Sequence, residues 1–476
     1  MTAQRIECDV AIVGAGPAGL SAATAASMSG ARTLIIDAYV EAGGQYWMQA
    51  SDGRLIGSQA AEGREAIHRA EASGVQFLKS AEVFAAYPDF QLFTNGRAGT
   101  ARIDCRTVVV ASGAHDRTTA FPGWTLPGVM TAGGGQRLAK TQGVVPGMRI
   151  VLSGSGIFLY AVADTLLDKG AEIVALIEMR RNETVLARHL ARFPERWLEA
   201  AALFGRVRRR VRRWLNGRVV VEALGVERVG AVRVAKLDGS GIETIEGIDS
   251  LLTSYGFQPQ IEVTSLLGCA HRFDDALGGW HVEADPATGR TSVDGVFAAG
   301  EVTGVSGARP AQLSGTLAGY AAARALGLAV PPEATASLVR QLARARAFGQ
   351  GLGRIFAPLP ELSRLARDDT VLCRCEEVTV GEVRAAVREG ARSLYGSKIW
   401  TRAGMGRCQG RMCRMPMTMT LVAATGRPAS EIGYNQPRVP ARPVPVDAVL
   451  DALSADATSN CSTPASNRLN VSPAKL

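Results

Sequence analysis

The sequence is poor in aromatic residues and contains no long apolar run. Phe, Trp and Tyr make up 6% of its 476 residues. No apolar run approaches the roughly 18 residues that suggest a membrane-spanning helix. Residues 1–8 also lack the basic and then apolar pattern of a secretory signal. We therefore expect a cytoplasmic protein without a transmembrane segment, a pattern that still allows peripheral association with the inner membrane.

Glycine, by contrast, is abundant. The chain holds 53 glycines, and it is 47% hydrophobic and 20% charged. This composition excludes a disordered or fibrous protein. Since the length exceeds that of a single ordinary domain, we expect two or three α/β domains joined by tight glycine turns.

The formal net charge of +9 is concentrated in one place. Residues 206–213, RVRRRVRR, hold six arginines and supply most of the surplus. No aromatic-interleaved basic surface and no recognition motif accompany this run. We interpret it as a solvated helix face or a partner patch, and we expect no binding of nucleic acid.

A glycine turn near the N-terminus lies between two segments that predict buried strands. Gly14 permits a sharp turn, Gly16 lets the backbone approach a pyrophosphate, and Gly19 lets the following helix pack on the strand. The second strand closes at Asp37, whose carboxylate can accept hydrogen bonds from a ribose. The helix N-terminus offers free N–H groups and a partial positive charge to phosphate. The pattern predicts a dinucleotide-binding unit.

The same pattern returns in residues 149–178. Gly154 and Gly156 repeat the first two glycines, and Glu178 takes the place of the acid. The third glycine position holds Leu159, which predicts a helix held away from its strand and weakens the case for a nicotinamide site. A working second nucleotide unit and a structural or vestigial one both stay open.

Two further predicted strands run into glycine turns, in residues 106–117 and 292–304. In a parallel sheet, the carboxyl ends of the strands converge on the crevice where cofactors lie. We therefore expect Gly113, Gly300 and Glu301 to lie near one ligand.

Eight cysteines without a secretory signal argue against a disulfide scaffold. Four of them form a C-x-C pair and a C-x4-C pair. Thr379 and Glu382 predict a capping box that starts a helix beyond the first pair, and glycines surround the second pair in residues 401–415. These features favour a metal centre on Cys373, Cys375, Cys408 and Cys413.

Three kinds of site compete for this module. Structural zinc sites pair cysteines as C-x2-4-C, so the C-x-C pair matches poorly. A [2Fe-2S] cluster with four thiolates is anionic and favours a basic shell, and residues 371–415 hold nine Lys or Arg against four Glu. We favour a [2Fe-2S] cluster, with zinc and free buried thiols as the alternatives.

Beyond these patterns, the sequence resembles known families. It resembles two-dinucleotide-domain flavoproteins of the pyridine nucleotide-disulfide type. The resemblance lies in IVGAGPAGLSAA with Asp37, and in the segments at 43–46, 111–114, 121–134 and 296–301. CRCEEVT with RAGMGRCQGRMC resembles the module of bacterioferritin-associated ferredoxin. Taken together, these motifs make the chain, as far as about residue 446, resemble the A subunits of opine oxidases and of dye-linked proline or hydroxyproline dehydrogenases. The B subunit of hydrogen cyanide synthase is similar too.

The resemblance implies an α/β fold of two Rossmann-like dinucleotide-binding domains followed by a small C-terminal helical [2Fe-2S] module. We expect the following division: an FAD domain, 1–125 and 285–330; a second, NAD(P)-like domain, 126–284; a helical connector, 331–366; the [2Fe-2S] module, 367–430; and a Pro-rich extended segment with a disordered tail, 431–476.

The resemblance also implies cofactors and their ligands. FAD would be held by Gly14, Gly16, Gly19, Asp37, Gly44, Gln45, Gly113, Gly300 and Glu301, and the cluster by the four cysteines above. Glu301 stands where much of the wider family has Asp. The family pattern further allows an FMN at a subunit interface, and it leaves open whether the second unit holds NAD(P), ATP or no nucleotide.

The implied role is that of an electron relay. Amine oxidation would belong to a second flavoprotein subunit similar to D-amino-acid oxidase. Further candidate partners are a downstream electron acceptor and a small third subunit. A self-contained NAD(P)H-dependent flavin reductase is the alternative, and an assembly scaffold with relic cofactor sites is a third. Catalytic residues are not identified.

Two absences narrow the chemistry. Neither the region after GGQY (residues 43–46) nor residues 149–255 contain a cysteine, which excludes disulfide exchange as the main activity. The five histidines show no H-E-x-x-H or Ser/His/Asp context, so hydrolysis has no support. We interpret His115, which follows the predicted flavin-binding turn at Gly113, as a loop residue.

Overall fold

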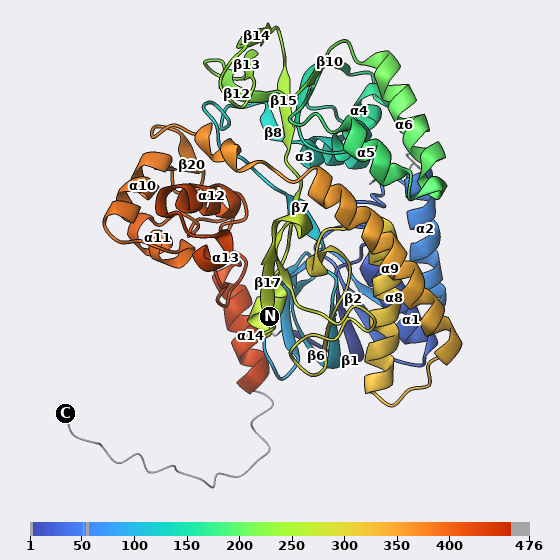
Figure 1. Ribbon diagram of the computed structural model, residues 1–476. Coiled ribbons are helices and arrows are strands. Elements are labelled where there is room, and N and C mark those ends of the chain that lie inside the picture. The colour runs from blue at the N-terminus through green and yellow to red at the C-terminus, as the bar shows by residue number, and fades with distance from the viewer. Residues whose placement is uncertain (1–2, 51, 54–56, 458–476) are drawn as a thin grey trace, which may run out of the picture.

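The computed structural model describes residues 3–50, 52–53 and 57–457. Two α/β units lie one above the other, and a helical C-terminal part packs against their side (Figure 1). The expected fold class, with two dinucleotide-type units, is confirmed for the α/β part by the two separate sheets. The disordered tail expected at the C-terminus lies outside the described residues beyond position 457.

The first unit is built on a seven-stranded sheet with strand order β3-β2-β1-β6-β5-β4 and β19 paired with β6. The strands β1, β2, β3, β6 and β19 run parallel, whereas β5 pairs antiparallel with β6 and with β4. Their bounds are β1 Gln4–Val13, β2 Thr33–Ile36, β3 Gln76–Leu78, β4 Ala81–Ala86, β5 Gln91–Gly96, β6 Gly99–Val110 and β19 Val296–Ala298. Because β19 comes from a distant part of the chain, the unit is discontinuous in sequence.

Three helices cover this sheet: α1 (Pro17–Met28), α2 (Gly57–Ala72) and α8 (Ala308–Ala325). Helices α1 and α8 cross closely because α8 carries Gly315 and Gly319. A Cβ at either glycine would lie 2.1 Å from a backbone oxygen of α1, at Ala18 or Ala22. The crossing places α8 beside the helix that begins at the first glycine turn.

The second unit is a five-stranded parallel sheet with the order β11-β10-β9-β15-β8. Its strands are β8 Val129–Thr131, β9 Arg149–Gly154, β10 Glu172–Glu178, β11 Trp214–Asn216 and β15 Ser250–Ser254. Its helices are α3 Ala132–Arg137, α4 Phe158–Asp168, α5 Glu183–Leu190 and α6 Trp197–Arg210. An antiparallel sheet, β12 Val219–Leu224, β13 Ala231–Ala235 and β14 Glu243–Glu246, caps this unit.

The basic run lies at the end of α6 and just beyond it. Arg206 pairs with Asp164 at 2.7 Å and Arg210 with Asp168 at 2.6 Å. The surplus positive charge is therefore partly neutralised by the neighbouring helix α4.

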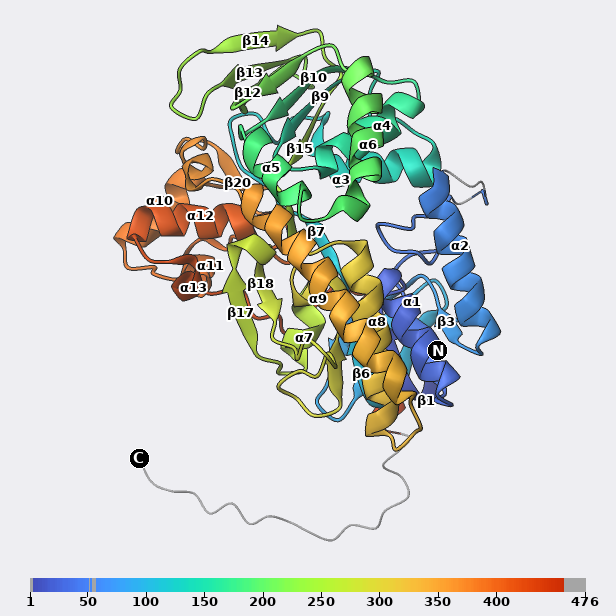
Figure 2. The same cartoon turned by 45° about the vertical axis from the view of Figure 1, so that its right-hand side comes forward.

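Short elements connect the two units. Strands β7 (Ala114–Asp116) and β16 (Phe257–Pro259) pair antiparallel between them. Helix α7 (Glu262–Leu266) and the hairpin β17 (His271–Asp274) with β18 (Gly279–Val282) follow β16. These elements lie between the first sheet and the C-terminal part (Figure 2).

The long helix α9 (Pro332–Ile355) leads from the first unit to the C-terminal part. That part contains β20 Val371–Cys373, β21 Val378–Thr379, α10 Val380–Arg388, α11 Leu394–Thr401, α12 Arg414–Thr425, α13 Ala429–Ile432 and α14 Val446–Ala457. The predicted capping box is confirmed, with Thr379 and Glu382 satisfying each other's backbone N–H groups. Residues 433–445, within the Pro-rich segment that we expected to be extended, form neither helix nor strand, and the helix α14, which the sequence did not predict, follows them.

The C-terminal part shares a core with the second unit. Buried Leu372, Val383 and Leu421 belong to the same apolar cluster as Phe121 and Trp124. The indole of Trp124 also donates to the carbonyl of Val371 at 2.6 Å. The C-terminal part therefore packs against the second unit and, within the described residues, does not form a separate domain core.

Within the described residues, no helix combines the length and the apolar character needed to cross a bilayer.

Candidate functional site

The first glycine turn links β1 to α1 and is tightly constrained. Gly14 has φ +108°, and a Cβ there would lie 2.5 Å from the carbonyl oxygen of Ala111. A Cβ at Gly19 would lie 1.7 Å from the oxygen of Gly14. Gly16 is the N-cap of α1 and has no side chain to cap the helix. The first N–H groups of α1 are thus left for an external acceptor such as a phosphate.

Asp37 ties this turn to the end of β2. Its carboxylate accepts from the backbone N–H of Ala15 at 2.5 Å and of Tyr39 at 2.7 Å. Burial raises the pKa of Asp37 above its ordinary value, although these two hydrogen bonds oppose the shift. The carboxylate therefore fixes the turn, and its remaining lone pairs are what a ribose hydroxyl would use.

The loop after β2 lies against the glycine turn. Gly44 has φ +61°, and a Cβ there would lie 2.8 Å from the Cα of Gly16. Gln45 donates through its amide to the hydroxyl of Tyr39 at 2.8 Å. A cavity of about 420 Å³ opens here, lined by Ala38, Tyr39, Val40, Glu41, Gly44, Met48, Gln49, Arg137, Thr141 and Gln142.

Arg137 was not predicted for this site. It lies at the end of α3 in the second unit, and its guanidinium carbon stands 3.7 Å from the centre of the Tyr39 ring. Stacking of a guanidinium on an aromatic face is favourable. No sequence signal marks Arg137, because it reaches the cavity from the other α/β unit.

The remaining predicted flavin residues lie at the ends of neighbouring strands. β6 pairs with both β1 and β19, so the turns that follow these three strands meet at one sheet edge. Gly113 has φ +72° and Gly300 has φ +75°, and a Cβ at Gly300 would lie 2.7 Å from the Cβ of Ala18 on α1. Burial raises the pKa of Glu301 beside it. The structure thus brings Gly14, Gly113 and Gly300 to the same edge.

The four cysteines of the C-terminal module occur as two pairs. Cys373 and Cys413 are buried, whereas Cys375 is exposed and Cys408 is partly exposed. Cys413 donates to Cys373, and this hydrogen bond lowers the pKa of Cys373 to about 5. Cys375 and Cys408 form the second hydrogen-bonded pair. Among the described residues, no three His, Cys, Asp or Glu side chains adopt the arrangement of a metal site.

A glycine wrap surrounds the thiols. The amide of Gly404 donates to the sulfur of Cys373 at 3.5 Å, and a Cβ on Gly404 would lie 3.9 Å from the sulfur of Cys413. A Cβ on Gly406 would lie 2.3 Å from the Cβ of Cys375. A side chain is thus excluded at Gly406, and Gly404 has φ +86°, a conformation that favours glycine.

Asn435 completes this wrap and was not predicted from the sequence. A Cβ on Gly404 would lie 3.0 Å from its amide nitrogen, and one on Gly410 would lie 3.3 Å from it. Both polar atoms of the amide are buried and have no hydrogen-bond partner. A buried unpartnered amide is costly, so Asn435 presents a free donor and acceptor to the cysteine loops. No motif marks this residue, because it lies beyond the cysteine pattern in the Pro-rich segment.

A buried charge cluster joins the module to the first unit. The guanidinium groups of Arg414 and Arg442 lie 4.0 and 3.8 Å from the carboxylate of Glu262. Burial would raise the pKa of Glu262, but these two cations outweigh it and hold the pKa below its ordinary value. His115 lies nearby in β7, and burial lowers its pKa to about 4. We predicted that His115 lies in a loop, but the structure places it, partly buried, in the strand β7.

The second glycine turn repeats the geometry of the first. Glu178 accepts from the backbone N–H of Gly156 at 3.0 Å and of Arg180 at 3.2 Å. Burial raises the pKa of Glu178 to about 7. Leu159 is fully buried in the core of this unit.

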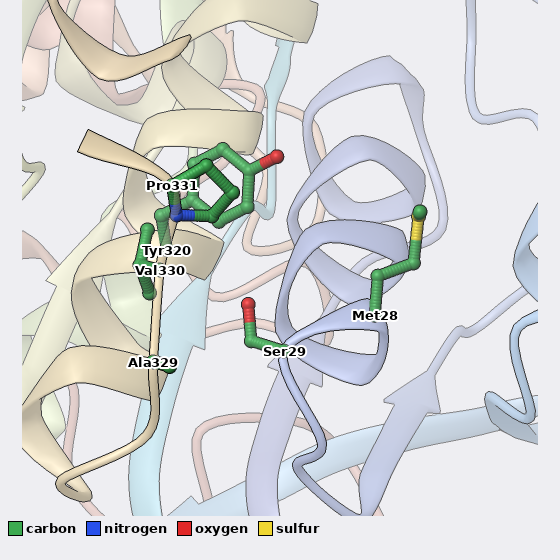
Figure 3. Close-up of a pocket in the computed structure, with 6 residues that line it drawn as sticks. All are labelled: Met28, Ser29, Tyr320, Ala329, Val330 and Pro331. Carbon is green, nitrogen blue, oxygen red and sulfur yellow. The ribbon is translucent and has the colours of Figure 1, made fainter. Parts of the chain in front are cut away.

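Another cavity, of about 390 Å³, lies near the far end of α1. Its lining comes from the end of α1, from Tyr320 on α8 and from the segment that joins α8 to α9 (Figure 3). The hydroxyl of Ser29 donates a hydrogen bond to the carbonyl of Ala25. Besides Ser29, the lining offers the hydroxyl of Tyr320, and among the described residues it contains no charged side chain; the cavity lies away from the glycine turn.

Comparisons with known proteins agree with this geometry. The family model for pyridine nucleotide-disulphide oxidoreductases matches residues 8–327, and the model for the sarcosine oxidase A3 domain matches residues 369–454. The fold and the glycine turns define a flavin-dependent oxidoreductase, and the chain belongs to the pyridine nucleotide-disulphide oxidoreductase family.

More specific relatives match along nearly their whole length. The A subunit of opine oxidase from Rhizobium meliloti (strain 1021) is 31% identical, over 94% of this chain and 99% of the relative. The HcnB subunit of hydrogen cyanide synthase from Pseudomonas aeruginosa is 30% identical, over 92% and 97%. Within its family, the chain thus groups with the opine oxidase A subunits, as the motifs predicted.

A solved structure extends the likeness in fold. The L-proline dehydrogenase from P. horikoshii superposes with a TM-score of 0.71 at 20% identity, and the match covers 94% of this chain and 80% of that chain.

Proposed function

We propose that this chain is the FAD- and [2Fe-2S]-containing subunit that relays electrons in a heteromeric amine dehydrogenase. The carrying observation is that one chain holds both a dinucleotide turn and a glycine-wrapped set of four thiols with the unpartnered amide of Asn435 beside them. When bound, FAD supplies two-electron chemistry and the cluster supplies one-electron steps.

The first unit fits FAD. The turn at Gly14 admits no side chain, the N-terminus of α1 has no side-chain cap, and the cavity beside Asp37 has room for part of a nucleotide. The ends of β6 and β19 add Gly113 and Gly300 at the same edge. These residues would bind the cofactor and keep water from its buried side.

The cysteine loops fit a small inorganic core. Four thiols of two adjoining loops would supply its ligands, and Gly404 and Gly410 leave space for it. The amide of Asn435 would donate to a sulfur at this position, which satisfies the buried polar atoms. Because Cys375 is exposed and Cys413 is buried, one side of the site faces solvent or a partner.

Names of the relatives support a partner chain. The opine oxidase relative and HcnB are each called a subunit, so we extend a heteromeric assembly to this chain. Oxidation of an opine, proline or hydroxyproline would take place on a second flavoprotein subunit similar to D-amino-acid oxidase. The same proposal includes a third small subunit, an FMN at the subunit interface and a cytoplasmic location. It also includes the division of the chain into domains at residues 125, 284, 330, 366 and 430.

The proposal is tested by expressing the chain with and without its genomic neighbour. We expect the isolated chain to bind FAD and iron but to leave opines and proline unoxidised, and the pair to oxidise one of them with an artificial electron acceptor. Full substrate turnover by the isolated chain would show that it is no relay. A colourless, iron-free protein from anaerobic expression would support the scaffold alternative instead.

A further inference from the structure

The second glycine turn is covered by another part of the same chain. In a working dinucleotide unit, the pyrophosphate lies at the start of the helix that follows the turn. Here that place is next to Gly156, between β9 and α4. A Cβ on Gly156 would lie 3.6 Å from the Cβ of Phe356, the residue that follows α9. The end of α9 therefore lies where phosphate would approach.

Three side chains around this turn donate to backbone carbonyls at the end of α9. The hydroxyl of Ser155 donates to Phe356 at 3.1 Å. The amide of Asn182 donates to residue 355 at 2.6 Å, and the guanidinium of Arg180 donates to residue 357 at 2.6 Å. Ser155 follows β9 and the other two follow β10, so these are the donors that would meet the phosphates and ribose of a bound nucleotide.

Charge also opposes a nucleotide at this place. The carbonyls at the carboxyl end of a helix carry a partial charge of about −0.5. Residues 355–357 direct these carbonyls toward the turn, where a pyrophosphate would bring further negative charge. Arg180 is already hydrogen-bonded to this end of the helix, so a nucleotide would have to displace it.

The end of α9 is wedged between the two units. Glycines at 349, 351 and 353 let it approach closely: a Cβ at these positions would lie 2.0 Å from the oxygen of Ser306, 2.0 Å from the ring of His189, and 2.2 Å from the oxygen of Ala276. Each glycine in a helix interior costs about 1 kcal/mol relative to alanine. Three of them in five residues are retained because the helix end fits between its neighbours, beside α5 (Figure 2).

We infer that the carboxyl end of α9 is the resident ligand of the second glycine turn, in place of a pyridine or adenine nucleotide. The second unit then holds the end of α9 in place, and we call the contact of residues 355–357 with this turn the seat of α9. NAD(P)H would not bind at this turn, so it would not supply electrons to this chain. The inference does not depend on the cysteine site, because it concerns the second unit alone.

The first test is a nucleotide titration of the FAD-loaded full chain. We expect calorimetry with NADH, NADPH and ATP to show no saturable binding with a Kd below about 1 mM. We also expect anaerobic NADH and NADPH to leave the flavin absorbance unbleached. Saturable binding, accompanied by faster hydrogen exchange in residues 352–357, would overturn the inference.

The second test loosens the seat. In the variant carrying Asn182→Ala and Phe356→Ala, we expect the amide of residue 356, which donates to Leu352 at 2.9 Å, to exchange at least tenfold faster while FAD is retained. Leu198→Ala, at an exposed site on α6, is the matched control. The single variant Asn182→Ala removes one donor without changing the core and serves if the double variant does not fold. Unchanged exchange in the folded variants would contradict the seat.

Discussion

At the scale of single residues, the motifs located the turns but missed the side chains that finish each site. Gly14 and Asp37 could be placed from spacing, since their conformations follow from the strand-turn-helix pattern. Arg137 and Asn435 could not, because each reaches its site from a distant segment and no local pattern marks it. Sequence reasoning recovers backbone requirements better than contacts that depend on tertiary packing.

Asn435 offers a direct test at this scale. Asn435→Leu keeps a similar volume but removes the amide that faces the cysteine loops. Because a hydrogen bond to a cluster sulfur favours the reduced form, we expect the variant to retain iron and to show a lower reduction potential in an EPR-monitored titration. Gln436→Leu, at an exposed neighbouring site, is expected to leave the potential unchanged. An unaltered potential in iron-replete Asn435→Leu would rule out the contact.

His271 gives a prediction for pH dependence. Burial lowers its pKa to about 4, aided by the positive charge of His281 and Arg414, while Glu262 opposes the shift. In the unfolded chain the pKa returns to about 6.5, so the unfolded state binds more protons between these values. The resulting stability is complete above about pH 6.5 and is lost as the pH falls toward 4.

We expect this loss to amount to about 1 to 3 kcal/mol. Thermal unfolding of His271→Gln should depend less steeply on pH over this range than the wild type does, whereas His68→Gln, at an exposed position on α2, should follow the wild type. Equal slopes for all three proteins would refute the assignment to His271.

At the scale of elements, the periodic and glycine-rich segments were predicted well. The strand at the start, the repeated turn in residues 149–178 and the capping box of α10 follow from local sequence. Helix α14 was missed because prolines dominate the segment before it and favour an extended chain. The end of α9 on the second turn was also beyond prediction, because glycines at 349, 351 and 353 have no visible role until their neighbours are known.

The crossing of α1 and α8 can be tested with a pair of glycine variants. Gly315→Ala would place a Cβ 2.1 Å from a backbone oxygen of α1, so we expect a loss of about 1 to 3 kcal/mol in the free energy of unfolding and weaker retention of FAD. Gly205→Ala on α6 meets nothing within 4 Å and should stabilise the protein by up to about 1 kcal/mol. If both variants behave alike in chemical denaturation, the close crossing is not a constraint.

At the scale of the whole molecule, the arrangement suits the electron relay that we propose. The first unit presents its flavin turns at one sheet edge, the second holds the end of α9, and the cysteine module is joined to the first unit through Glu262, Arg414 and Arg442. These buried charges tie the cysteine module to the first unit. This arrangement fixes the distance between the two proposed cofactor sites, which electron transfer requires.

The central claim is that the four cysteines hold a [2Fe-2S] cluster that receives electrons within the assembly. The most direct measurement is EPR spectroscopy with iron analysis on the anaerobically purified complex after reduction by its amine substrate. We predict a reduced-cluster signal in the wild type and in Cys269→Ser, and its loss together with the iron in Cys408→Ser. Equal iron and equal signals in both variants, or no signal in the wild type, would contradict the account.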